Sequence, residues 1–263
     1  MTAAQAQQAF LSHPSAEEAL DGLHAQVWRA HAWARAPLHT VATGEALLDA
    51  QLPGGGWPVG ALTELLQEAG VHNEWRLLLP ALAQHGSGPV VLVGPPHPPF
   101  APALLAQGLQ TQRLLCLCPG AFAMDTAQKA TPPVAPASCL WATEQALRCA
   151  PVDTVVAWLA QVRPHQLRRL QLAAAEHHKL LFVVRSLQAQ HEASPAVLRL
   201  KLSLNVQSHV CVEVLKRRGP PAADLVQWAA RPAALQQVLA AHGAPDRPPQ
   251  AQTPSARQMH QQP

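Results

Sequence analysis

The segment between Gln67 and Arg76, QEAGVHNEWR, has the position of a phosphate-binding loop but not its residues. It follows an apolar run, residues 61–66, whose length suits a buried strand, although periodicity alone does not exclude a helix. A phosphate cradle needs small residues that let backbone N–H groups reach the oxygens, together with a cation. This segment has one glycine, no Gly-Lys pair and no Ser or Thr for a magnesium ion. Glu68 and Glu74 would place negative charge near a triphosphate, so the residues argue against nucleotide hydrolysis.

Two groups of basic residues offer contacts to nucleic-acid phosphates. One opens a predicted helix and the other closes a predicted hairpin, where Arg199 and Lys201 would extend it. The proposed DNA-contacting residues are Arg163, Arg168, Arg169, Lys216, Arg217 and Arg218. If they form one face, affinity for DNA should fall steeply with salt. No interleaved aromatic residues are available to stack on bases, and a solvated helix face is the alternative interpretation.

Cys116 and Cys118 lie two residues apart on a predicted strand, so they should point to the same side of it. Such a pair could bind a metal ion, but no second pair of Cys or His stands at ligand spacing. Two small buried hydrophobic residues are the simpler interpretation. The fourteen scattered histidines add no ligand set, and we predict no metal site and no cofactor.

Composition indicates a protein that folds in a reducing cytoplasm. Of the 263 residues 48% are hydrophobic and 13% charged, which suits one large α/β domain. No apolar run reaches the roughly 18 residues of a membrane helix, and no basic and then apolar N-terminal segment indicates secretion. Five cysteines without framework spacing suit a reducing compartment. The net charge of +3 neither demands nor excludes nucleic acid.

The chain divides into an N-terminal helical arm, residues 1–40, an α/β domain, residues 41–242, and a polar tail, residues 243–263, that should be disordered. Helices alternate with buried strands along the domain, which favours a mostly parallel sheet with helices on both faces. The last strands should form an antiparallel hairpin, with Arg199 on its exposed side, followed by a helix. The predicted strands are residues 61–66, 89–94, 114–118, 152–159, 179–185, 197–204 and 209–215; the predicted helices are residues 15–35, 74–85, 100–108, 139–149 and one that begins at Arg163, with a last one within 222–242.

The entry stretch, VATGEALLDAQLPGGGWPVGALTELLQEAG, resembles the start of RecA-type ATPase cores. It is most similar to the ImuA family of SulA-like and RecA-like proteins, and VLRLKLSL with VCVEVLKRRGPP resembles the end of the same core. The resemblance covers about residues 20–220. It implies a RecA-like core and a non-catalytic accessory role in damage-induced (SOS) mutagenic translesion synthesis. The implied partners are ImuB, a catalytically inactive polymerase homologue, and an error-prone polymerase III alpha-type subunit, with RecA as a further candidate.

The resemblance also shows which catalytic residues are missing. RecA-type ATPases carry a glutamate that activates water after their second core strand, where this chain has Pro95 to Pro99. They carry a magnesium-binding aspartate after a later strand, which here ends in Ala157 to Leu159, and Asp153 stands at the opposite end of that strand. Together with the missing lysine and hydroxyl residue, three catalytic positions are absent at once. We therefore expect no enzyme activity.

The predicted helix from Ser15 to Arg35 carries more apolar surface than a solvated arm should expose. RecA-type proteins assemble by docking a segment outside the core onto a neighbour, so we expect this helix to contact a RecA-like neighbour or ImuB. Its Trp28→Ala variant should lose about 2 kcal/mol of binding. A helix packed on its own core is the alternative. The proposed partner-binding residues are Leu20, Leu23, Val27, Trp28 and Trp33.

Three other functions stay open at this point. A divergent ATPase with an unorthodox loop would reveal itself by binding nucleotide. A SulA-like inhibitor of cell division would share the same scaffold and would cause filamentation when overexpressed. An autonomous DNA-binding protein would use the basic residues described above.

Overall fold

The structure is a computed structural model that describes residues 39–118, 136–207, 209–221 and 225–229. All the elements below belong to the compact unit formed by residues 38–263. The predicted arm as far as residue 38, with all five proposed partner-binding residues, and the predicted tail lie outside the described residues. In the described ranges no helix is both long and apolar enough to cross a membrane.

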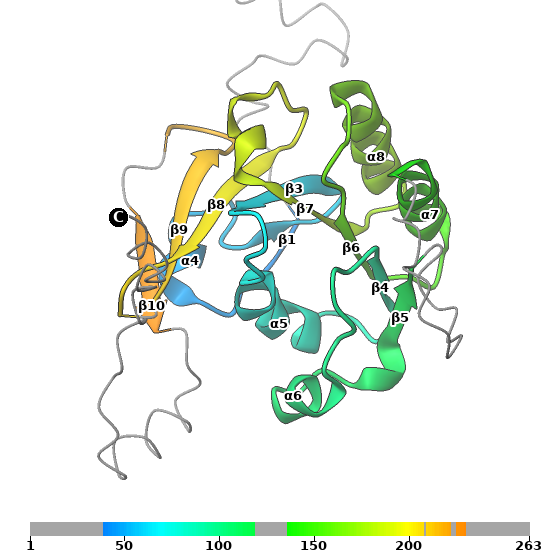
Figure 1. The fold of residues 1–263 in the computed structure, drawn as a ribbon, viewed down its shortest axis with the longest axis horizontal. Coiled ribbons are helices and arrows are strands. Elements are labelled where there is room, and N and C mark those ends of the chain that lie inside the picture. The colour runs from blue at the N-terminus through cyan, green and yellow to red at the C-terminus, as the bar shows by residue number, and fades with distance from the viewer. Residues whose placement is uncertain (1–38, 119–135, 208, 222–224, 230–263) are drawn as a thin grey trace, which may run out of the picture. The chain divides into compact units, whose positions relative to one another are not determined.

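Eight strands form one sheet in the order β10-β9-β8-β3-β7-β6-β4-β5 (Figure 1). The six strands from β3 to β8 run parallel to one another, and β9 and β10 are antiparallel additions at one edge. This arrangement confirms the predicted α/β fold with a mostly parallel sheet and a C-terminal antiparallel hairpin. The strands are β3 (Ala61–Gln67), β4 (Val90–Val93), β5 (Leu114–Leu117), β6 (Thr154–Trp158), β7 (Leu180–Ser186), β8 (Leu198–Leu204), β9 (His209–Lys216) and β10 (Val226–Ala229).

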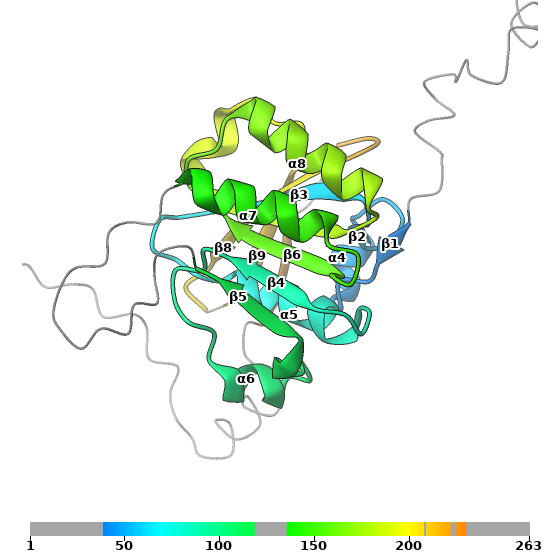
Figure 2. The ribbon, with the colours of Figure 1, turned by 90° about the vertical axis from the view of Figure 1, so that its right-hand side faces the viewer.

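Helices cover both faces of the sheet because its central strands are apolar on both sides (Figure 2). The first face packs against α4 (Ala46–Asp49), α5 (Glu74–Gln84) and α6 (Ala101–Ala106). The second packs against α7 (Pro136–Arg148) and α8 (Pro164–Glu176). The remaining elements are the short antiparallel pair β1 (Thr40–Val41) and β2 (Trp57–Pro58), and the 3-10 helices η1 (Thr111–Arg113) and η2 (Leu187–His191).

The entry stretch is held by a local hydrogen-bond pattern around Thr43. Its hydroxyl accepts the backbone N–H of Glu45 at 3.1 Å, and its own N–H donates to Asp49 Oδ1 at 2.8 Å. Glu45 is the residue that precedes α4. Gly44 has a φ of +88°, and an added Cβ would lie 2.4 Å from Cβ of Pro80 in α5. Glycine is therefore required where α4 approaches α5.

The prediction of a helix within residues 222–242 is wrong for the first part of that range. Residues 226–229 instead form β10, which pairs antiparallel with β9, and Val226 is buried while Gln227 is exposed. Over so short a length, the apolar residues of this stretch are compatible with the period of a helix or of a strand. The edge of β9 offers backbone hydrogen bonds to a further strand, so the stretch adopts the extended conformation. The rest of the predicted helix lies beyond the described residues.

Cys116 is exposed and Cys118 is only partly covered, so the prediction that both are buried is wrong. They belong to β5 and its end, and β5 pairs with β4 alone because it is the last strand of the sheet. An edge strand has a neighbour on one side only, which leaves its side chains open to solvent. Partial desolvation by its neighbours raises the pKa of the Cys116 thiol, and the nearby Cys118 raises it further. No cluster of metal ligands occurs among the described residues.

Candidate functional site

The segment after β3 is closed by hydrogen bonds to Glu74, the first residue of α5. The Glu74 carboxylate accepts Gln67 Nε2 on Oε2 at 2.6 Å and the indole N–H of Trp158 on Oε1 at 3.0 Å. Gln67 Oε1 in turn accepts the backbone N–H of Asn73 at 3.2 Å. Glu74 is 1% exposed. The buried Glu74 carboxylate and its uncharged donors therefore fix the conformation of the loop that follows β3.

Glu74 places this negative charge at the N-terminal end of α5, where the helix dipole and free N–H groups attract an anion. A phosphate at the same place would be repelled by the carboxylate that is already there. The other acid of the segment, Glu68, is exposed and lies outside this network. Of the two acids named in the sequence analysis, only Glu74 occupies the N-terminal end of α5.

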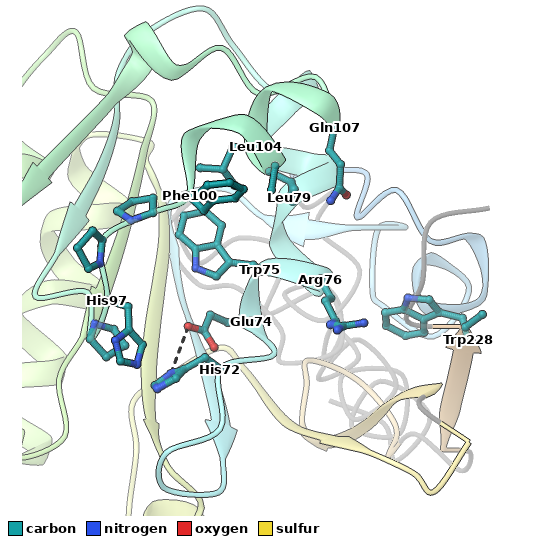
Figure 3. A pocket seen from close by; sticks show the side chains of 15 residues that line it. His72, Glu74, Trp75, Arg76, Leu79, His97, Phe100, Leu104, Gln107 and Trp228 are labelled. Atoms are coloured by element: carbon teal, nitrogen blue, oxygen red, sulfur yellow. Dashed lines mark ion pairs between the residues drawn. The ribbon is translucent and has the colours of Figure 1, made fainter. Parts of the chain in front are cut away.

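A cavity of about 660 Å³ opens beside Glu74 (Figure 3). Trp75 and Phe100 stand at its centre, and Phe100 is 70% exposed. His72 and His97 lie at one end, with ring centroids 5.0 Å apart in an edge-to-face contact. The cavity also has Trp228 and Ala229 of β10, α6 and the Pro96–Pro99 segment as walls. We call this cavity the aromatic groove.

Two indole groups that line the aromatic groove, those of Trp75 and Trp228, differ from a third indole nearby. The third, Trp158, packs against Trp75 at a centroid distance of 6.3 Å and donates to Glu74. The indole N–H groups of Trp75 and Trp228 donate to nothing in the part of the chain that the structure describes. An indole N–H beside an apolar ring surface suits a ligand that offers a carbonyl oxygen next to an apolar group.

A second buried carboxylate, Glu64 of β3, belongs to an ion cluster under η2. Its Oε1 lies 3.1 Å from Arg185 Nη1 and its Oε2 lies 2.7 Å from Arg199 Nε. Arg185 also pairs with Glu192 at 2.7 Å, and the remaining N–H groups of Arg199 donate to backbone carbonyls of residues 189–192. The prediction that Arg199 is exposed on the polar side of its strand is wrong, because η2 and the following loop cover it. It is 7% exposed.

The first basic group lies on α8. Arg163 precedes the helix and its backbone N–H donates to Gln166 Oε1 at 2.8 Å. Arg169 pairs with Glu144 of α7, and Arg168 is exposed. Since α8 follows β6, Arg163 lies at the carboxyl end of the parallel strands.

The second basic group follows β9. Lys216 Nζ donates to the carbonyl of Ser194 at 2.9 Å, and Arg217 donates to the carbonyls of Gln51 and Pro220. Partial desolvation lowers the pKa of Lys216, and the charge of Arg199 lowers it further, whereas Glu64 opposes both.

The two basic groups do not form one face. Arg217 and Arg218 line a small cavity with Pro58 and Val197, which precede β3 and β8. They therefore lie at the amino end of the parallel strands, opposite Arg163. Contact of either group with DNA stays a prediction.

A second cavity, of about 930 Å³, lies between β5 and α7. Its exposed apolar side chains are Leu115, Leu117 and Trp141, the last of them 65% exposed. It shares no lining residue with the aromatic groove, which makes it a useful control surface.

Neither a scan against models of known protein families nor a search of curated proteins finds a match to this chain.

The sequence contains a signal for part of the aromatic groove. Trp75 and Phe100 follow β3 and β4, and the loops after parallel strands are where α/β sheets bind ligands. Trp228 had no such signal, because its stretch was taken for a helix. Glu64 had none either, because a lone acid in an apolar run does not reveal its partners.

Proposed function

We propose that this chain is a non-catalytic, RecA-like accessory protein that acts through protein–protein contacts in damage-induced mutagenic translesion DNA synthesis. The observation that carries the loss of catalysis is the Glu74 carboxylate at the start of α5, held by Gln67 and Trp158. A nucleotide phosphate would have to bind at the position that this carboxylate occupies. The same edge of the sheet carries a groove whose chemistry suits a polypeptide better than a triphosphate.

The RecA-like core is supported by the parallel strands and by the position of the loop. β3 lies inside the sheet between β7 and β8, and its carboxyl end opens on the closed segment and the aromatic groove. Ligand sites of open α/β sheets occur at this edge. The entry stretch that resembles ImuA proteins leads directly into this strand.

The proposed partners follow from the same resemblance: an ImuB-like polymerase homologue, an error-prone polymerase III alpha-type subunit, and RecA as a further candidate. Affinity capture from cells after DNA damage, followed by mass spectrometry, should recover the first two with this chain as bait. The purified pair should then bind directly. Capture of the cell-division tubulin homologue, with no polymerase component, would support the SulA-like function and contradict this one.

The loss of catalysis has its own test. Purified chain should give no ATP turnover above a matched blank, with or without single-stranded DNA, and no calorimetric signal for nucleotide. A Glu74→Gln variant should serve as a matched control without turnover. ATP turnover that disappears when a residue between Gln67 and Arg76 is changed would contradict the proposal.

A further inference from the structure

The aromatic groove has the features of a site for an extended, proline-containing peptide. Trp75, Phe100 and Trp228 present ring surfaces, and the indole N–H groups of Trp75 and Trp228, which have no acceptor among the described residues, can donate to carbonyl oxygens. A polyproline II segment has no internal hydrogen bonds, so its carbonyls are available, and its low conformational entropy makes binding to aromatic grooves favourable.

The path of the chain indicates which peptide this is. β10 ends at Ala229, and Trp228 and Ala229 themselves line the aromatic groove. The chain continues for 34 residues, 230–263, which lie outside the described residues. Of these, residues 243–263 contain five prolines, including the Pro248-Pro249 pair, and carry both signs of charge beside it on Asp246 and Arg247.

We propose that the proline-rich segment 243–263 of the same chain binds in the aromatic groove. Eighteen residues, 230–247, separate Ala229 from Pro248, so the segment can return to the groove where its tether begins. A tether of this kind gives an effective concentration on the order of millimolar, which lets weak contacts hold. The inference does not depend on the proposed role in DNA synthesis.

Photocrosslinking in the full chain tests the proposal. The probe p-benzoylphenylalanine replaces Phe100, whose exposed ring the probe resembles. After irradiation, mass spectrometry should place the crosslink in residues 243–263. A mixture of ¹⁵N-labelled and unlabelled protein should give crosslinks within one molecule only. The same probe at Trp141, in the control cavity, should give no crosslink to that segment, and thermal melts should match the parent protein.

A change in the segment provides the second arm. The Pro248→Ala/Pro249→Ala variant should lower the crosslink yield by about tenfold, the effect of losing roughly 1.4 kcal/mol of binding. The Gln261→Ala/Gln262→Ala variant in the same segment should leave the yield unchanged. Crosslinks only to another part of the chain, or only between labelled and unlabelled molecules, would overturn the proposal. So would the absence of any crosslink, or an equal yield from the probe at Trp141.

Discussion

Glu64 of β3 and Glu74, the first residue of α5, are ten residues apart and almost equally buried, yet their charges are balanced in different ways. Glu64 faces two guanidinium groups, from Arg185 and Arg199, within 3.1 Å. Glu74 is held by an amide and an indole, which are neutral, and lies 3.8 Å from His72 Nδ1. Glu64 is enclosed under η2, whereas Glu74 borders the aromatic groove.

The difference separates a buried ion cluster from a carboxylate at the border of the aromatic groove. A buried charge is tolerated when other charges pair with it, and removing one member leaves the rest uncompensated. A carboxylate at a helix N-terminus with neutral donors depends less on any single partner. The Glu64 cluster should therefore determine stability, whereas Glu74 should determine what binds at the groove.

The largest expected effect is that of Glu64→Gln. It leaves Arg199 buried without a carboxylate partner and Arg185 with Glu192 alone, and we expect a loss of about 3–5 kcal/mol of unfolding free energy. Urea unfolding followed by circular dichroism measures it. The control is Glu213→Gln, which breaks the exposed pair with Lys201 and should cost less than about 1 kcal/mol. Equal losses in both variants would show that the Glu64 cluster stabilises the fold no more than an exposed ion pair does.

Glu74→Gln should have a smaller effect. The amide oxygen can still accept one of the two donors, Gln67 or Trp158, but its NH₂ group cannot accept the other. Leaving one buried donor unpaired costs about 1–3 kcal/mol, less than the loss at Glu64. The same urea titration measures it. The comparison between the two acids fails if Glu74→Gln costs as much as Glu64→Gln.

The smallest expected effect is the pH dependence that Lys216 adds at the edge of the Glu64 cluster. Its pKa is lowered from 10.5 in the folded protein by desolvation and by Arg199. Between the lowered pKa and 10.5 the unfolded chain binds more protons than the folded one, so stability should rise with pH. Urea midpoints from pH 8 to 10.5 should rise more in the parent protein than in Lys216→Gln. If the urea midpoints of the two proteins change equally with pH, Lys216 does not contribute to the pH dependence of stability.

Particular residues show how far the sequence alone could lead. The runs of Val90–Val93 and Leu180–Ser186 were recognisable as strands because a parallel strand buried on both faces is apolar throughout. Arg199 was misplaced by the alternation of polar and apolar residues in its strand. That pattern shows two sides but not what covers each, and Glu64, 135 residues earlier, supplies the partner. Trp228 was misplaced because four residues are too few to separate the two periods.

The sequence by itself determined the strands and helices of the core and the absence of phosphate-binding residue types between Gln67 and Arg76, because both depend on residues that are adjacent in the chain. Only the tertiary structure decided that β10 joins the sheet at β9, that Glu64 and Glu74 are balanced by such different partners, and that the six basic residues lie in two separate places. It also brought Trp75, Phe100 and Trp228 together around one groove. These features depend on which segments distant in the chain come into contact, and local patterns of hydrophobicity do not carry that information.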